Sequence, residues 1–136
     1  MKKPTFFRLK HTKRGSALAV PNDARTQAVL GEDPIPVLRD WGSGAFDWTG
    51  SDRPTYTEAK PESDDETPAW WMQPDHAEWL ALLKDDAVVW VRHVELTDND
   101  NASMGRSKGV WKIGGVSIED ETLTLRLVER VGDVRL

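Results

Sequence analysis

Cysteine is absent from this 136-residue chain, and long apolar runs are absent as well. Without a thiol, the chain has no disulfide, thiolate zinc site, iron–sulfur cluster or cysteine nucleophile. No segment approaches the roughly 18 consecutive apolar residues of a membrane span, and no apolar stretch follows the basic N-terminus as in a signal peptide. We therefore expect no membrane partner and a cytoplasmic location, or a place in the virion if the chain is phage-encoded.

The core-forming residues Leu, Ile, Val and Phe are scarce. They make up only about a fifth of the chain, close to the level of disordered proteins. Most of them follow residue 74. The length suits one domain over 1–136. Residues 41–68 contain no aliphatic side chain larger than Ala and no helical or strand period, so they cannot bury a core of their own. We expect an extended acidic, aromatic arm over 41–68, with a solvated linker over 52–68.

Charge is distributed unevenly, although the formal net charge is only −5. Residues 1–20 hold six basic residues and no acidic one, whereas residues 40–67 hold eight acidic residues and two basic ones. The overall acidity, with a pI of about 5.2, disfavours nucleic acid as a partner. The basic head and the acidic arm are complementary, which favours pairing within one chain or self-association between two.

The N-terminal half predicts short elements. Alternation over 5–11 and 16–20 around Gly15 predicts a basic β-hairpin within 1–20. Asn22 or Asp23 is placed to cap a short helix that ends at Leu30, before Gly31. Two prolines within 33–38 predict an extended edge or a loop.

The C-terminal half predicts the core over 74–136. An amphipathic helix is expected over 74–84, followed by a strand over 87–96 and a polar loop over 97–109. The Gly114-Gly115 pair predicts the turn of a second hairpin over 110–118, and alternating leucines predict a strand over 122–129. The predicted fold class is α+β: a small, mainly antiparallel β-sheet domain with one amphipathic helix and a long irregular aromatic and acidic arm.

Catalysis has weak support. His76 lies beside Asp75 and Glu78, and His93 shares a strand face with Glu95. No serine lies in the G-x-S-x-G pattern of a nucleophile elbow. Ordinary helix-terminus and cross-strand pairs explain these neighbours more simply. We expect no catalytic residue and no cofactor.

Two polar segments resemble ligand loops only in part. Asp98 to Asn101 begins like a calcium loop, but the later positions lack the glycine and the acidic ligand, so no metal is expected. Residues 105–109 lack the helix that follows a phosphate-binding glycine loop, but their cations suit a phosphate or an acidic partner. The candidate basic contacts are Lys10, Lys13, Arg14, Arg106 and Lys108.

Tryptophan is abundant, with seven in the chain. Trp79, Trp90 and Trp111 have aliphatic neighbours and are expected in the core. The other tryptophans lie in segments with little aliphatic material, so they must dock either onto the domain or onto another molecule. With the neighbouring aromatic and acidic residues they form the candidate partner-binding set: Trp41, Phe46, Trp48, Tyr56, Glu62, Asp64, Asp65, Glu66, Trp70 and Trp71.

These features favour a non-catalytic protein–protein interaction subunit, an accessory or structural component of a larger assembly such as a phage particle. Two alternatives remain open. One is an acidic inhibitor, of the anti-defence or immunity type, that blocks a partner's basic nucleic-acid-binding site, in which case one contiguous acidic face is expected. The other is a small enzyme that uses His76 or His93, in which case the histidine should lie in a pocket with a carboxylate.

Overall fold

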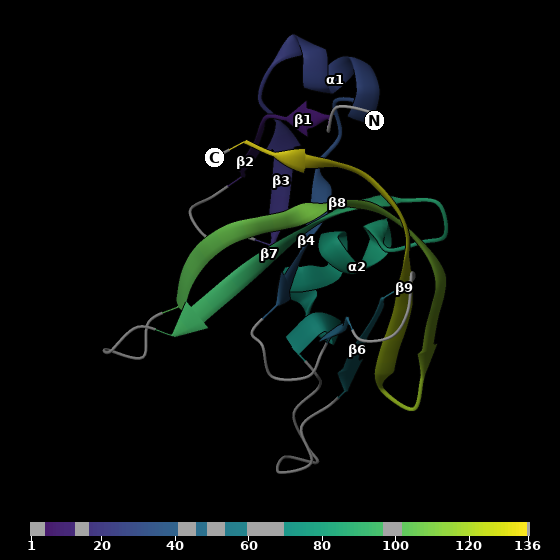
Figure 1. Ribbon diagram of the computed structural model, residues 1–136. Helices are drawn as coiled ribbons and strands as arrows, with labels where there is room; N and C mark the ends of the chain where they lie inside the picture. The colour runs from purple at the N-terminus through teal and green to yellow at the C-terminus, as the bar shows by residue number, and fades with distance from the viewer. Residues whose placement is uncertain are drawn as a thin grey trace.

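The computed structural model describes residues 5–12, 17–40, 46–48, 54–59, 70–96 and 102–135. A nine-stranded mixed sheet dominates them, and both α-helices are short (Figure 1). The fold is therefore mainly β, which is coarsely compatible with the predicted α+β class. None of the helices in these ranges has the length and apolar character needed to cross a membrane.

The sheet follows the order β2-β3-β4-β7-β8-β9-β6-β5, with β1 paired to β9. Neighbouring strands are antiparallel except for two parallel pairs, β4 with β7 and β1 with β9. The strands are β1 (Phe6–Phe7), β2 (Leu9–His11), β3 (Leu18–Pro21), β4 (Ile35–Asp40), β5 (Phe46–Asp47), β6 (Thr55–Ala59), β7 (Val88–Leu96), β8 (Ala102–Glu119) and β9 (Thr122–Val134).

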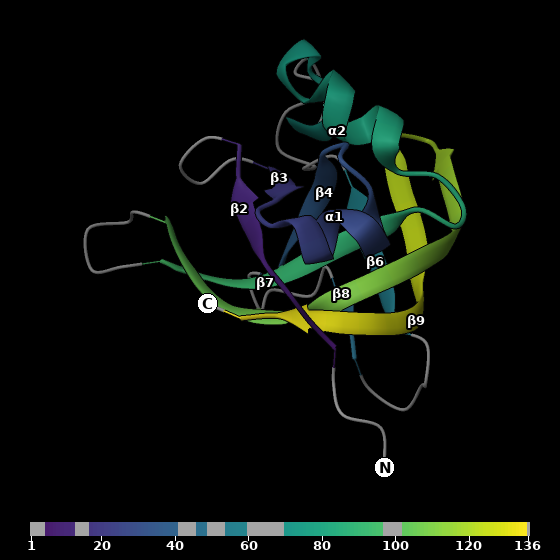
Figure 2. The same ribbon diagram turned by 90° about the horizontal axis from the view of Figure 1, so that it is seen from above.

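The N-terminal segment closes part of this sheet into a ring. Leu9–His11 pairs with β3, while Phe6–Phe7 pairs with the end of β9, so residues 6–11 join two distant strands (Figure 2). The amide of Asp133 donates to the carbonyl of Thr5 at 2.9 Å, and the amide of Arg135 donates to that of Phe7 at 3.2 Å. The predicted N-terminal hairpin is present in the antiparallel pairing of β2 with β3, whereas residues 6–7 of its predicted first strand pair with β9 instead.

Two apolar clusters fill the molecule. The first lies inside the ring, since each strand around it contributes a buried side chain: Phe7, Leu9, Ala19, Ile35, Val37, Trp90, Val110 and Val134. The second lies between the rest of the sheet and α2 and holds the largest aromatics: Leu38, Phe46, Tyr56, Trp71, Trp79, Leu83, Val89, Val91, Ile113, Leu123, Leu125 and Leu127. The predicted leucine alternation in β9 is confirmed, because its three leucines are buried.

The two helices begin and end near the predicted residues. Helix α1 (Ala24–Leu30) is capped by the Asp23 side chain, which accepts from the Thr26 amide at 2.8 Å, and it ends at Gly31. The predicted helix over 74–84 is shorter than expected: two 3₁₀ turns, η1 (Trp70–Met72) and η2 (Pro74–His76), precede α2 (Ala77–Leu82). Trp79 of α2 is buried against the sheet, and its indole donates to the carbonyl of Val37 at 3.1 Å.

Three predictions about strands are wrong. Residues 35–40 form β4 inside the sheet, between β3 and β7, rather than an edge. Pro36 is tolerated because the pairing with β7 begins after it, at Val37. Residues 102–109 belong to the 18-residue strand β8 rather than to a loop. The chain turns at Asp120 and Glu121, with φ of 49° and 59°, as a type I′ turn requires, and not at Gly114-Gly115.

The predicted linker over 52–68 is wrong for Thr55–Ala59, which pair with β9 as strand β6. Strand β5 adds to β6 through Phe46 and Asp47. The segment lacks aliphatic residues, but its aromatic side chains pack on the leucines of β9. The run Asp98 to Asn101 and most of the predicted arm lie outside the described residues, as do residues 1–4 and 13–16 of the basic head.

Candidate functional site: a cationic tryptophan pocket

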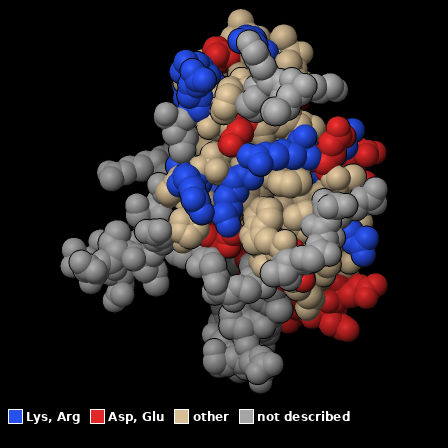
Figure 3. Space-filling view, in the orientation of Figure 1, with Lys and Arg blue, Asp and Glu red and all other residues tan. Residues whose placement is uncertain are grey.

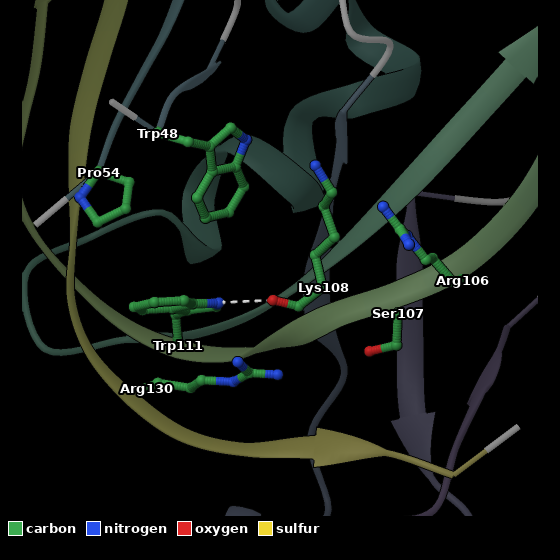
Figure 4. A pocket seen from close by; sticks show the side chains of 7 residues that line it. All are labelled: Trp48, Pro54, Arg106, Ser107, Lys108, Trp111 and Arg130. Atoms are coloured by element: carbon green, nitrogen blue, oxygen red, sulfur yellow. Dashed lines mark hydrogen bonds between the residues drawn. The ribbon is translucent and has the colours of Figure 1, made fainter. Parts of the chain in front are cut away.

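A pocket of about 540 Å³ opens where β8 and β9 pass the β5–β6 region (Figure 4). Strand β8 contributes four of its lining residues, and β9 contributes one. The described residues that line it are Trp48, Pro54, Arg106, Ser107, Lys108, Trp111 and Arg130. We call this site the cationic tryptophan pocket.

Two indoles form the apolar part of the pocket. The ring centroids of Trp48 and Trp111 lie 6.2 Å apart at an interplanar angle of 56°. Trp48 is held from behind by Phe46, which stacks on it at 5.2 Å and 16°, and Trp111 is held by its indole, which donates to the Lys108 carbonyl at 3.0 Å. Both indoles are half-buried and anchored, so they are ready to contact a ligand without reordering.

Three cations surround these rings, and two of them are compensated. Lys108 binds the buried Asp40 at 2.5 Å, and its Nζ lies 4.8 Å from the centre of the Trp48 ring. The Trp48 indole donates to the same carboxylate at 2.9 Å. Arg130 binds Asp133 at 2.8 Å. Arg106 is exposed and has no carboxylate partner within the described ranges, so the described lining residues carry one uncompensated positive charge.

A hydrogen-bond network beneath the pocket fixes β8 to its neighbours. The Ser107 hydroxyl donates to Asp133 at 2.5 Å and accepts from the Trp90 indole at 2.9 Å and from the Gly109 amide at 3.2 Å. Buried Arg92 donates to the Gly105 carbonyl at 2.6 Å and to His11 Nε2 at 2.8 Å. Burial lowers the pKa of Arg92. The hydroxyl of Ser107 is fully used, which leaves it a structural role rather than that of a nucleophile.

Gly109 makes the close packing at the pocket wall feasible. Its φ of 106° favours glycine, and a Cβ at this position would lie 2.8 Å from Arg130 Nε and 2.9 Å from Trp111 Nε1. Any larger residue would therefore displace both of these lining side chains.

The structure brings some of the predicted contacts together and separates others. Arg106 and Lys108, predicted as basic contacts, lie in one pocket with Trp48, predicted to bind a partner. Lys10 is exposed on β2 and does not line this pocket. Lys13 and Arg14 lie outside the described residues.

Among the predicted partner-binding aromatics, three are buried in the chain's own core. Phe46, Tyr56 and Trp71 have exposed fractions of 8%, 1% and 0%. The sequence was compatible with docking of these aromatics either on the domain or on a partner. In the structure these three side chains pack on the domain. Several members of the set lie outside what the structure describes: Trp41, Glu62, Asp64, Asp65, Glu66 and the side chain of Trp70.

Several residues of the site were not singled out from the sequence, among them Trp111, Arg130 and Asp40. Trp111 was expected only in the core, but it is half-buried and lines the pocket as well. Arg130 comes opposite Trp111 through the β8–β9 register, and Asp40 comes beside Lys108 through β4. The signal for Trp111 was present, because it alternates with buried Val110 on a strand and so faces the other side of the sheet.

The histidines have different surroundings. His76 lines a second pocket of about 460 Å³ with Asp75, Glu78, Arg39 and Trp79, so it meets the condition set for the enzyme alternative, which stays a prediction. Burial lowers the pKa of Arg39. His93 is half-buried on β7, opposite Asp40 of β4 in the strand register.

The surface charge agrees with a cationic site. Lys and Arg side chains form a band across the centre of the face drawn in Figure 3, with acidic side chains beside it. Comparison with protein families, with characterised proteins and with solved structures finds no match for this chain.

Proposed function

We propose that this chain is a non-catalytic binding protein that docks an acidic segment of a protein partner in the cationic tryptophan pocket, as a subunit of a larger assembly. One observation carries the proposal. Three cations and two anchored indoles line a single pocket.

The charge balance of the pocket supports a carboxylate-bearing ligand. Lys108 and Arg130 are compensated by Asp40 and Asp133, so Arg106 supplies the excess charge. A pocket with one excess positive charge suits one or two carboxylates better than a chain of phosphates. The net charge of −5 also repels a polyanion at long range.

The two indoles support a ligand that carries an apolar or aromatic side chain next to its carboxylate. Trp and Arg are the residue types that most often dominate the binding energy of protein interfaces. Trp48 and Trp111 are already fixed by Phe46 and by the Lys108 carbonyl, so little side-chain entropy is lost on binding.

The residues of the pocket also support a role without catalysis. Ser107 is the single hydroxyl-bearing side chain among the described lining residues, and its donor and acceptor positions are all used. No histidine lines the described part of the pocket. Binding therefore accounts for the arrangement better than proton transfer does.

Calorimetric titration with a short peptide of alternating Asp and Phe tests the proposal. We expect the peptide to bind, and the double variant Arg106→Gln, Arg130→Gln to weaken its binding about tenfold, as loss of about 1.4 kcal/mol predicts. The matched control is Arg126→Gln, an exposed cation of β9 outside the pocket, which should bind like the wild type.

Three further probes separate the alternatives. The Asn/Phe form of the peptide should bind much more weakly, because it keeps the rings and loses the carboxylates. Titration with a peptide of residues 61–68 of this chain tests whether a second copy is the partner. Tighter binding of a single-stranded oligonucleotide than of the acidic peptide, or equal binding of the peptide by the double variant, contradicts the proposal.

A further inference from the structure

A second cationic pocket lies at the seam where the ring of strands closes. Its volume is about 210 Å³, and it is lined by Phe6, Phe7, Arg8, Asp23, Arg25 and Arg135. These residues come from three places: the segment that starts with β1, the start of α1, and the end of β9. We call this site the arginine seam.

Positive charge is in excess at the arginine seam. Three guanidinium groups face one carboxylate among the described lining residues. That carboxylate, of Asp23, already accepts from the Thr26 amide at 2.8 Å and lies 3.7 Å from Arg8 Nε. Arg25 and Arg135 have no carboxylate within ion-pair distance among the described residues, so their donors remain available.

The backbone that carries these arginines is fixed. The Arg8 amide donates to the Thr26 hydroxyl at 2.9 Å, which ties the β1–β2 segment to α1. The Arg135 amide donates to the Phe7 carbonyl at 3.2 Å, and its guanidinium lies 4.9 Å from the centre of the Phe6 ring. Stacking on a ring leaves the donors at the edge of a guanidinium free to bind an anion.

We propose that the arginine seam binds a tetrahedral oxyanion, that is, inorganic phosphate or a phosphoryl group on a larger molecule. The planar fork of arginine matches phosphate oxygens with paired hydrogen bonds, and the small polar pocket suits a group of this size. This site is separate from the cationic tryptophan pocket and shares none of its lining residues. Because its arginines lie just after β1, in α1 and just after β9, a bound anion also stabilises the closed ring.

Thermal unfolding in inorganic phosphate against chloride, at equal ionic strength and pH, tests this proposal. Phosphate at ten times its dissociation constant should raise the Tm of the wild type by about 4 °C. The double variant Arg25→Gln, Arg135→Gln should lose this rise. Both side chains are exposed, and circular dichroism in chloride will show that the variant is folded.

The control is the double variant Arg106→Gln, Arg130→Gln, which should keep the full rise in phosphate even if the acidic-partner proposal fails. A wild type with no phosphate-specific rise, or an equal rise in the arginine-seam variant, overturns the inference. A phosphoserine peptide compared with its serine form, and a 5′-phosphorylated oligonucleotide compared with its unphosphorylated form, identify the source of the anion. Arginine-seam-dependent binding of any of these supports the site.

Discussion

Tryptophans with similar surroundings in the sequence are placed differently in the fold. Trp71 is fully buried and Trp48 is half-buried, although the sequence places both in segments poor in aliphatic residues. Composition alone predicts that such aromatics must dock somewhere, but it does not say where. The choice depends on which surface lies nearby in the fold, here the leucine face of β9 for the core aromatics and the cations of β8 for Trp48.

The single tyrosine of the chain gives a direct test of its placement. Tyr56 is buried, and its hydroxyl donates to Glu58 at 2.9 Å; burial, followed by the Glu58 charge, raises its pKa well above the ordinary value of 10.0. Ultraviolet titration of the folded protein should therefore detect no tyrosinate at pH 10. In Glu58→Gln the pKa should fall toward its ordinary value.

The raised pKa of Tyr56 also makes the stability of the fold depend on pH. The unfolded chain loses the Tyr56 proton near pH 10 while the folded chain keeps it, so stability should decline as the pH rises through this value. Tyrosinate absorbance that appears near pH 10 with the fold intact would show that Tyr56 is exposed, contrary to the structure.

At the scale of elements, the predictable parts are those set by local chemistry. The Asp23 cap, the Gly31 end of α1 and the alternation of Leu123, Leu125 and Leu127 each follow from neighbours in sequence. The turn at Asp120 and Glu121 was missed, because non-glycine residues take positive φ there and Gly114-Gly115 offered a stronger local signal. The place of β4 inside the sheet was missed because Pro34 and Pro36 disfavour a sheet interior, and pairing with β7 overrides that preference.

Closure of the ring by β1 gives a prediction at this scale. A Cβ added at Gly132 would lie 2.7 Å from the Thr5 carbonyl oxygen and would clash with the Phe7 ring. Gly132→Ala should therefore push β1 from β9 and lower the free energy of unfolding by about 1 to 3 kcal/mol, measured in urea. The amides of Asp133 and Arg135, which donate to this segment, should exchange faster.

The exposed Ser117→Ala on β8 is the matched control and should leave both measurements unchanged. Unchanged stability and exchange in Gly132→Ala would mean that β1 does not pack on β9 as described.

At the scale of the whole molecule, both candidate sites arise from contacts between distant parts of the chain. Arg130 reaches Trp111 through strand register, Asp40 reaches Lys108 across the sheet, and Arg135 reaches Phe6 where the ring closes. From the sequence, Arg106 and Lys108 were predicted as basic contacts and Trp48 as a partner-binding aromatic. That the three line one pocket was not predicted, because no local pattern encodes a contact between residues some 60 positions apart.

The proposed acidic protein segment docks in the cationic tryptophan pocket, against Trp48 and Trp111. Nuclear magnetic resonance of the tryptophan indole N–H groups, during titration with the Asp/Phe peptide, tests it most directly. We predict that the indole signals of Trp48 and Trp111 shift with added peptide, while those of buried Trp71 and Trp79 stay in place. Peptide binding that leaves the Trp48 and Trp111 signals unmoved would contradict docking in this pocket.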